Sequence, residues 1–73
     1  MAKTEIKTEI TGAVWKVLVK PGDRIAQDDP IIILESMKME IPIVVPDGGT
    51  VAAVLVKEGD PVTEGQTVAI VEG

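Results

Sequence analysis

The sequence consists of two copies of one half. A shift of 37 residues places Gly12 on Gly49, and the two copies stay aligned without a gap until Glu35 meets Glu72. The matched segments are Val17-Leu18-Val19-Lys20 with Val54-Leu55-Val56-Lys57, and Gly22-Asp23 with Gly59-Asp60. Two copies are too few for a solenoid, whose units need stacked neighbours on both sides. The repeat therefore predicts one closed fold built from two half-motifs that a pseudo-two-fold axis relates.

Each copy carries the signals of short strands separated by tight turns. A run rich in β-branched residues is followed by Lys-x-Gly-Asp and then by a second apolar segment. Gly22 and Gly59 predict a positive φ at these turns, and the aspartate after each can bond its own backbone. Asp28 stands where the second copy has Gly65, and aspartate tolerates the left-handed conformation better than most residues.

These signals predict an all-β fold, with one domain over residues 1–73 and half-motifs of about 1–37 and 38–73. Turns this close together leave no room for helical crossovers, so the sheets must be largely antiparallel. We expect a flattened barrel or sandwich of two four-stranded antiparallel sheets. The expected strands are Glu5 to Ile10, Val14 to Lys20, a short segment at Ile25, Ile31 to Leu34, Glu40 to Val45, Val51 to Lys57, a short segment at Val62, and Thr67 to Val71.

Composition excludes several classes of function. The chain has no Cys and no His, so it offers neither a thiol framework nor a His or Cys metal cluster, and no histidine could activate a hydroxyl nucleophile. A net charge of −5 argues against a nucleic-acid partner, because phosphate binding needs clustered Lys and Arg. No apolar stretch approaches the roughly 20 residues that span a bilayer. Met1 to Gly12 lacks the apolar centre of a secretory signal, so a cytoplasmic protein is expected.

Two further expectations concern packing. Trp15 aligns with Ala52 and thus breaks the pseudo-symmetry; filling of the core is the default expectation, and an exposed contact patch is the alternative. An acidic surface and closed sheet edges favour a monomer.

The segment between the two copies has an unusual composition for a hairpin turn. It reads Glu35-Ser36-Met37-Lys38-Met39-Glu40. Tight hairpins favour Gly, Asn or Asp at their central positions, whereas two thioether side chains here bracket a cation. Pseudo-symmetry places this turn at one end of the fold and the C-terminus at the opposite end, so the turn projects alone. Residues that local folding preferences do not explain are often functional.

A purely structural interpretation of the same turn is also open. Met37 and Met39 would then fill gaps at the end of the barrel. Lys38 would be a solvated charge held near Glu35 and Glu40, an interaction worth at most about 1 kcal/mol.

The turn resembles the attachment motif of the biotinyl/lipoyl carrier domain family. Within that family the biotin branch typically has Ala-Met-Lys-Met or Ser-Met-Lys-Met, and Ser36-Met37-Lys38-Met39 is similar to the second form. The resemblance extends from about Glu5 to Glu72 and includes the Gly12-x-Val14 opening and both Lys-x-Gly-Asp turns. It is closest to the single-domain biotin/lipoyl attachment proteins of bacteria. The inserted thumb of the bacterial acetyl-CoA carboxylase carrier is missing, because residues 24–30 leave no room for it.

The resemblance implies a barrel-sandwich hybrid fold and covalent biotin on Lys38. It implies that the ligase and the carboxylase recognise Met37 and Met39. Glu35 and Glu40 would be docking contacts or turn residues, and Ser36 would be a small turn residue. The implied partners are a biotin protein ligase, a biotin carboxylase and a carboxyltransferase. The domain itself would be a carrier without catalytic residues and without a metal.

Two alternatives stay open. Lipoate on the same lysine would serve acyl transfer, although the lipoyl branch usually has an acidic residue just before its lysine, where this chain has Met37. An unmodified interaction module, such as the lipoyl-like hairpin domain of a membrane-fusion adaptor, is the other alternative. Such domains normally carry a long helical insertion at the central turn.

Overall fold

The computed structural model describes residues 3–73, which form eight β-strands and no helix, and therefore contain no helix able to cross a membrane. The strands are β1 (Lys3–Lys7), β2 (Gly12–Val17), β3 (Arg24–Ile25), β4 (Asp29–Ser36), β5 (Met39–Val45), β6 (Gly49–Val54), β7 (Pro61–Val62) and β8 (Thr67–Glu72). The predicted all-β fold is confirmed. The first two residues of the predicted first half-motif lie outside the described residues.

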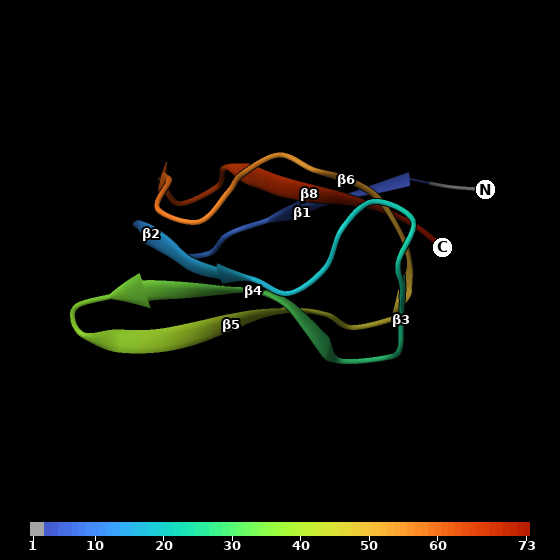
Figure 1. Cartoon of the computed structure of the whole chain (residues 1–73), viewed down its shortest axis with the longest axis horizontal. Coiled ribbons are helices and arrows are strands. Elements are labelled where there is room, and N and C mark those ends of the chain that lie inside the picture. The colour runs from blue at the N-terminus through green and yellow to red at the C-terminus, as the bar shows by residue number, and fades with distance from the viewer. Residues whose placement is uncertain (1–2) are drawn as a thin grey trace.

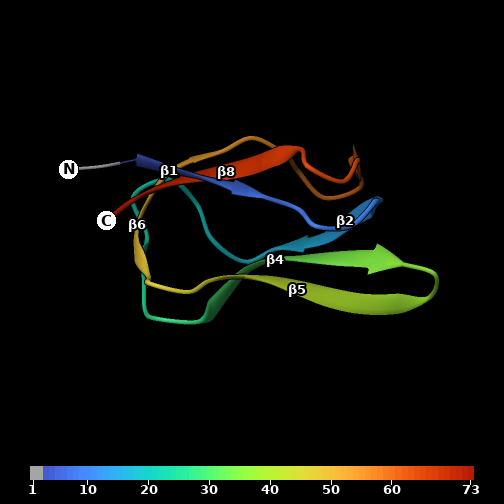
Figure 2. The same ribbon diagram turned by 180° about the vertical axis from the view of Figure 1, so that it is seen from behind.

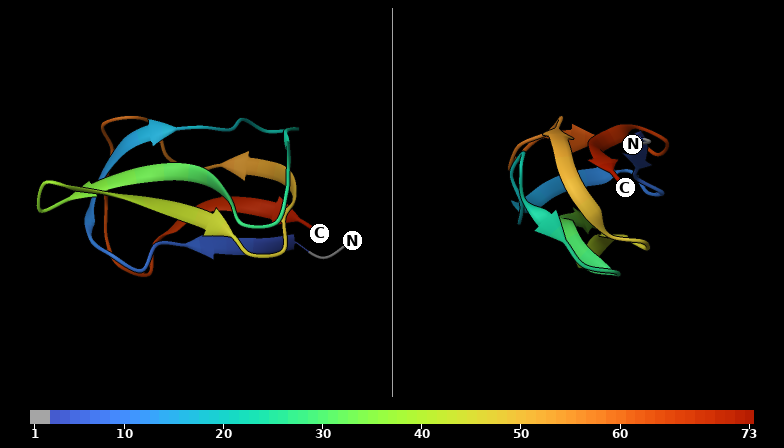
Figure 3. Two further views of the ribbon diagram at one scale, coloured as in Figure 1. Left: turned by 90° about the horizontal axis from the view of Figure 1, so that it is seen from below. Right: turned by 90° about the vertical axis from the view of Figure 1, so that its right-hand side faces the viewer.

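The strands form two four-stranded sheets that pack face to face (Figure 1). Their strand orders are β1-β8-β6-β3 and β5-β4-β2-β7, and every pair is antiparallel. A shift of 37 residues converts each strand of one sheet into the strand at the same place in the other. The two layers and their crossing connections are visible from behind (Figure 2) and end-on (Figure 3). The prediction of two antiparallel sheets related by a pseudo-two-fold is thus confirmed.

The hydrogen bonds of the two Lys-x-Gly-Asp turns repeat across this axis. The amide of Gly22 donates to the carbonyl of Val51, and the amide of Gly59 donates to the carbonyl of Val14, both over 2.8 Å. Both glycines have the predicted positive φ, 96° and 92°. Each turn therefore joins one half-motif to the other, because its glycine bonds to a strand of the opposite copy.

The aspartates after these glycines stabilise the turns as expected. Asp23 Oδ2 accepts the Lys20 amide proton, and Asp60 Oδ2 accepts that of Lys57, each at 3.0 Å. Asp28, in the second turn of the first copy, has a φ of 63° and so takes the predicted left-handed conformation.

The core lies between the sheets and is almost wholly aliphatic. Its buried members come from both halves, as expected for a closed fold: Val14, Ile25, Ile31, Ile32, Leu34, Val45, Val51, Val62, Val68, Ala69 and Val71. The second strands of the two sheets, β4 and β8, together supply most of these residues and are apolar except near their ends.

The first strand is shorter than predicted. The sequence pattern favours a strand over 5–10, but β1 ends at Lys7. Thr8 is buried, and its hydroxyl both donates to the Ile10 carbonyl at 2.9 Å and accepts the Ile10 amide proton at 3.1 Å. A side chain that satisfies the backbone locally competes with a sheet ladder, so the chain bends away here.

The core-filling expectation for Trp15 is wrong. A β-bulge in β2 between Val14 and Lys16 leaves Trp15 without a cross-strand partner and 42% exposed. Space between the sheets at this level is filled by Val14 and Leu34, which pair directly and are buried. The equivalent bulge in β6 leaves out Ala52.

The expectation of closed sheet edges is also wrong. The two sheets do not join into a continuous barrel, and β1 and β5 are edge strands of their sheets. The other two edges are β3 and β7, which have only two residues each.

Candidate functional site

The reversal between β4 and β5 is tighter than the 35–40 segment suggests. The two strands pair down to Ser36 opposite Met39, which leaves only Met37 and Lys38 in the turn. Their φ angles are 53° and 66°, so both central residues are left-handed, as in a type I′ hairpin turn. The hairpin extends beyond the rest of the fold, at the end opposite the chain's C-terminus (Figures 1 and 3). The predicted isolated, projecting turn is confirmed.

A left-handed conformation is unfavourable for residues that carry a Cβ atom. It costs roughly 1–2 kcal/mol per residue, which is why such turns prefer Asn and Gly. The paired strands impose this conformation on the turn. Seven cross-strand pairs join β4 to β5, from Asp29 opposite Val45 to Ser36 opposite Met39. The strands thus hold Met37 and Lys38 in a fixed and strained conformation at the tip.

The base of the hairpin is fastened to the neighbouring strand. Ser36 Oγ donates to the Thr11 carbonyl at 3.0 Å, so Ser36 is an anchor as well as a small turn residue. A Cβ atom on Gly12 would lie 2.5 Å from the Glu35 carbonyl oxygen, which shows how closely β2 approaches the hairpin. Sequence reasoning assigned no role in the site to Thr11 or Gly12. The signal was present, since Gly12 is the residue at which the internal repeat begins.

The two methionines of the turn are in solvent. Met37 is 92% exposed and Met39 is 62% exposed, so neither fills a gap at the end of the sandwich. The structural interpretation of these residues is therefore wrong. Exposed thioether side chains are adaptable apolar contacts that can match a partner surface.

Lys38 is also exposed, and no carboxylate holds it. Within residues 3–73 the one ion pair joins Lys3 Nζ to Glu72 Oε1 at 4.0 Å, at the opposite end of the molecule. The amine at the tip is consequently available to a reagent that approaches from solvent. The chain contains no histidine or cysteine that could act as a base beside it.

The glutamates on either side of the turn face each other across the hairpin. Glu35 and Glu40 are directly opposite in the β4–β5 ladder, one rung below Ser36 and Met39, and both are exposed. Like charges in this position destabilise a sheet. No group of three or more potential metal ligands occurs among residues 3–73, so these two carboxylates have no third partner for a cation.

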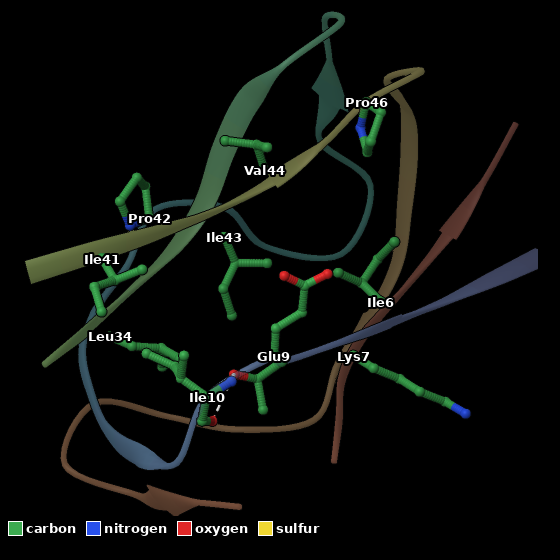
Figure 4. Close-up of a pocket in the computed structure, with 11 residues that line it drawn as sticks. Ile6, Lys7, Glu9, Ile10, Leu34, Ile41, Pro42, Ile43, Val44 and Pro46 are labelled. Atoms are coloured by element: carbon green, nitrogen blue, oxygen red, sulfur yellow. Dashed lines mark hydrogen bonds between the residues drawn. The ribbon is translucent and has the colours of Figure 1, made fainter. Parts of the chain in front are cut away.

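A shallow groove of about 280 Å³ lies elsewhere, between the edge strands β1 and β5. Its walls are mainly aliphatic, and it includes no residue from 35–40. The Glu9 side chain points between the two strands, whereas Lys7 points away from it (Figure 4). Ile6 and Ile43, which the pseudo-two-fold relates, lie on its opposite sides. The groove lacks converging polar groups, so it offers no chemistry of its own.

Comparison with known proteins connects this geometry to one family. The profile of the family described as "Biotin-requiring enzyme" matches residues 3–72. The chain is 52% identical over 60 residues to "Biotin/lipoyl attachment protein" of Bacillus subtilis, covering 82% of each sequence. It is 45% identical over 60 residues to "Dihydrolipoyllysine-residue acetyltransferase component of pyruvate dehydrogenase complex" of Cupriavidus necator, covering 82% of this chain and 11% of that protein.

Among solved structures, the Kluyveromyces lactis urea carboxylase matches with a TM-score of 0.91 and 33% identity. The match covers 99% of this chain but only 6% of the carboxylase, so this chain corresponds to one small module of that protein. Relatives whose names refer to biotin and to dihydrolipoyllysine therefore both match this sequence. This chain, with its lysine at the tip of a protruding hairpin, belongs to the biotin/lipoyl attachment domain family.

Proposed function

We propose that this protein is a biotin carboxyl carrier in which Lys38 holds biotin through an amide bond. The observation that carries the proposal is the position of the lysine. It is exposed, unpaired with any carboxylate of the described chain, and held at the tip of a two-residue turn. A carrier needs one accessible amine at a fixed place and no catalytic machinery around it.

The attachment step needs an activated acyl donor, because a free carboxylic acid does not acylate an amine directly in water. Biotinyl adenylate, made by a biotin protein ligase, is such a donor. The deprotonated Nζ of Lys38 attacks the biotinyl carbonyl, the C–N bond forms, the bond to AMP breaks, and the amine's proton passes to solvent. The positive charge of the tip is lost in this step.

The residues around Lys38 have distinct roles in this proposal. Met37 and Met39 are contacts for the ligase and the carboxylase, since they are the most exposed apolar side chains of the site. Ser36 fastens the hairpin, and Glu35 and Glu40 add negative charge beside the tip. Bound biotin supplies a site that takes up a carboxyl group at one enzyme and gives it up at another. The corresponding partners are a biotin carboxylase and a carboxyltransferase.

Lipoate on the same lysine is the second candidate, which the acetyltransferase relative supports. Methionine on both sides of Lys38 favours biotin. The family description also names biotin.

The first prediction is that Lys38 is the one residue modified. Incubation of the full chain with biotin, ATP and a biotin protein ligase should add one biotinyl group, measured by intact mass. Lys38→Arg should abolish the gain, because the guanidinium stays charged and does not acylate. Lys57→Arg, which changes an exposed lysine in the turn after β6, is the matched control and should load normally.

A parallel incubation with lipoate, ATP and a lipoate ligase separates the two cofactors. Loading by lipoate alone would contradict the biotin assignment. Loading of Lys38→Arg to the wild-type level would contradict the site.

A further inference from the structure

The pseudo-two-fold axis allows the outer faces of the two sheets to be compared position by position. The two sheets have the same strand order and the same register, so residues 37 apart in the sequence occupy equivalent positions. One sheet, β5-β4-β2-β7, carries the lysine hairpin, and the other carries the chain ends. A difference that folding does not require is a sign of function.

The outer faces differ sharply in chemistry. We compare residues on the outer face of each sheet, as the strand pairing places them. Each of them is exposed or half-buried. On the hairpin-bearing sheet they are Trp15, Lys16, Pro30, Ile33, Pro42, Val44 and Pro61. Their symmetry mates on the other sheet are, in the same order, Ala52, Ala53, Thr67, Ile70, Glu5, Lys7 and Arg24. Six of these seven positions beside the lysine are apolar, whereas four of their seven counterparts are polar or charged.

Trp15 is the largest side chain of this apolar face, and folding does not require it. The same bulge forms around Ala52 in the other sheet, so the backbone geometry needs no indole. Trp15 stays 42% exposed, and Lys16 Nζ lies 5.6 Å from its ring centroid. Tryptophan is enriched at protein interfaces relative to the rest of the surface, and it is among the residues that most often dominate binding.

Charge at the hairpin end of this face also departs from its counterpart. Glu35 and Glu40 oppose each other, whereas their symmetry mates Glu72 and Lys3 form an ion pair. The chain therefore keeps an unfavourable like-charge pair where the fold can accommodate a favourable one. A basic side chain from a partner would neutralise it.

The charge of the face and of the chain decides between possible occupants. A second copy would bring two net charges of −5 and two Glu35–Glu40 pairs together. A basic partner therefore fits better than a dimer.

The position of the face identifies the kind of partner. Ile33 lies five residues before Lys38, which is about 16 Å along a strand at about 3.3 Å per residue. An enzyme that reacts at the lysine amine must contact the turn itself. A typical interface is roughly 30 Å across, so the same enzyme would also cover this face.

We infer that the outer face of the β5-β4-β2-β7 sheet, centred on Trp15, is the docking surface for the enzyme that acylates Lys38. That enzyme meets the indole with an apolar patch and faces the Glu35–Glu40 pair with at least one Arg or Lys. The inference rests on the proposed function, because it assumes that a ligase modifies Lys38.

The test is the steady-state kinetics of biotinylation by a biotin protein ligase, with the full chain as the varied substrate. Trp15→Ala should lower kcat/KM about tenfold or more through KM, because a buried aromatic contact is lost. Leu55→Ala removes an apolar side chain that is 53% exposed outside this face and should leave kcat/KM within about twofold. Circular dichroism of each variant confirms that it folds.

Glu40→Lys supplies a second, independent readout. It recreates the ion pair of the opposite end, so a purely structural role predicts a more stable protein that is loaded at least as well. Docking instead predicts a raised Tm together with a several-fold lower kcat/KM. This loss of kcat/KM relative to the wild type should be smaller at high salt, because salt screens the charges.

The outcomes separate the two proposals. If the wild type is loaded and Trp15→Ala is loaded equally well, the docking surface is wrong and the proposed function stands. If the wild type sediments as a dimer and the Trp15→Ala variant sediments as a monomer, the face is a self-association surface and the inference is overturned. If no ligase loads the wild type, the proposed function fails and the docking surface fails with it.

Discussion

At the scale of single residues, the site depends on two backbone conformations that their own side chains disfavour. Met37 and Lys38 are both left-handed, with φ of 53° and 66°, although each has a Cβ atom. Glycine in these positions would fold more easily, but it would supply neither the amine nor the apolar contact. The chain therefore gives up stability at the tip for chemistry.

The second prediction follows from this strain. Lys38→Gly in the unmodified protein should raise the free energy of unfolding by about 1 kcal/mol, since glycine adopts positive φ without steric cost. For a domain of this size that corresponds to roughly 4–8 °C in Tm. Thermal unfolding followed by circular dichroism measures the change.

In a matched control the change in stability should have the opposite sign. Lys16→Gly replaces an exposed lysine inside β2, where φ is not positive, and should lower the stability by about 0.5–1 kcal/mol. A fall in Tm for both variants would show that the turn is not strained.

At the scale of elements, each sheet depends on one close approach between backbones. A Cβ atom on Gly12 would lie 2.5 Å from the Glu35 carbonyl oxygen, and one on Gly49 would lie 2.5 Å from that of Glu72. The two contacts are related by the pseudo-two-fold. Because one of them is at the base of the lysine hairpin, the contact that packs β2 against β4 also sets the direction of the hairpin.

The third prediction is that Gly12→Ala destabilises the protein by about 1–3 kcal/mol, the usual cost of overpacking. Backbone must move, since the nearest atom belongs to the main chain and not to a flexible side chain. Urea unfolding gives the magnitude. Gly73→Ala, where a Cβ atom meets nothing within 4 Å, is the control and should leave the midpoint unchanged. Equal midpoints for both variants would contradict the close approach.

At the scale of the whole molecule, the two half-motifs are interlocked. Each sheet takes two strands from either side of the turn at 37–38, and the turn glycines bond to the opposite half. Among the strand pairs of residues 3–73, only β2–β4 and β6–β8 stay within one half, whereas β1–β8, β2–β7, β3–β6 and β4–β5 join the two halves. A two-stranded ladder is marginal in water, so neither half can fold alone.

The fourth prediction is that peptides 1–37 and 38–73 are each unfolded in isolation. Proton NMR should show no amide dispersion for either peptide, in contrast to the full chain. An equimolar mixture should regain dispersed resonances at sufficient concentration, because the interface between the halves is the core itself. A dispersed spectrum for one isolated half would contradict the interlocking.

Much of this architecture was predictable from the repeat and its turns. Gly22, Gly59 and Asp28 took the backbone conformations expected of them. Strand ends were less predictable, because the first strand stops where the Thr8 hydroxyl satisfies the backbone locally. Trp15 was assigned to the wrong side, since an apolar residue within a strand pattern is assumed to face inward.

The sequence by itself determined the twofold repeat, the places where the chain turns, and the chemistry at the turn that projects alone. These are local properties, carried by glycines, aspartates and the residues around Lys38. Only the tertiary structure decided that the sheets keep open edges, that the hairpin turn has just two residues, and that Trp15 faces solvent. Those features depend on the register between strands distant in the sequence, and a single bulge in that register changes which face a side chain occupies.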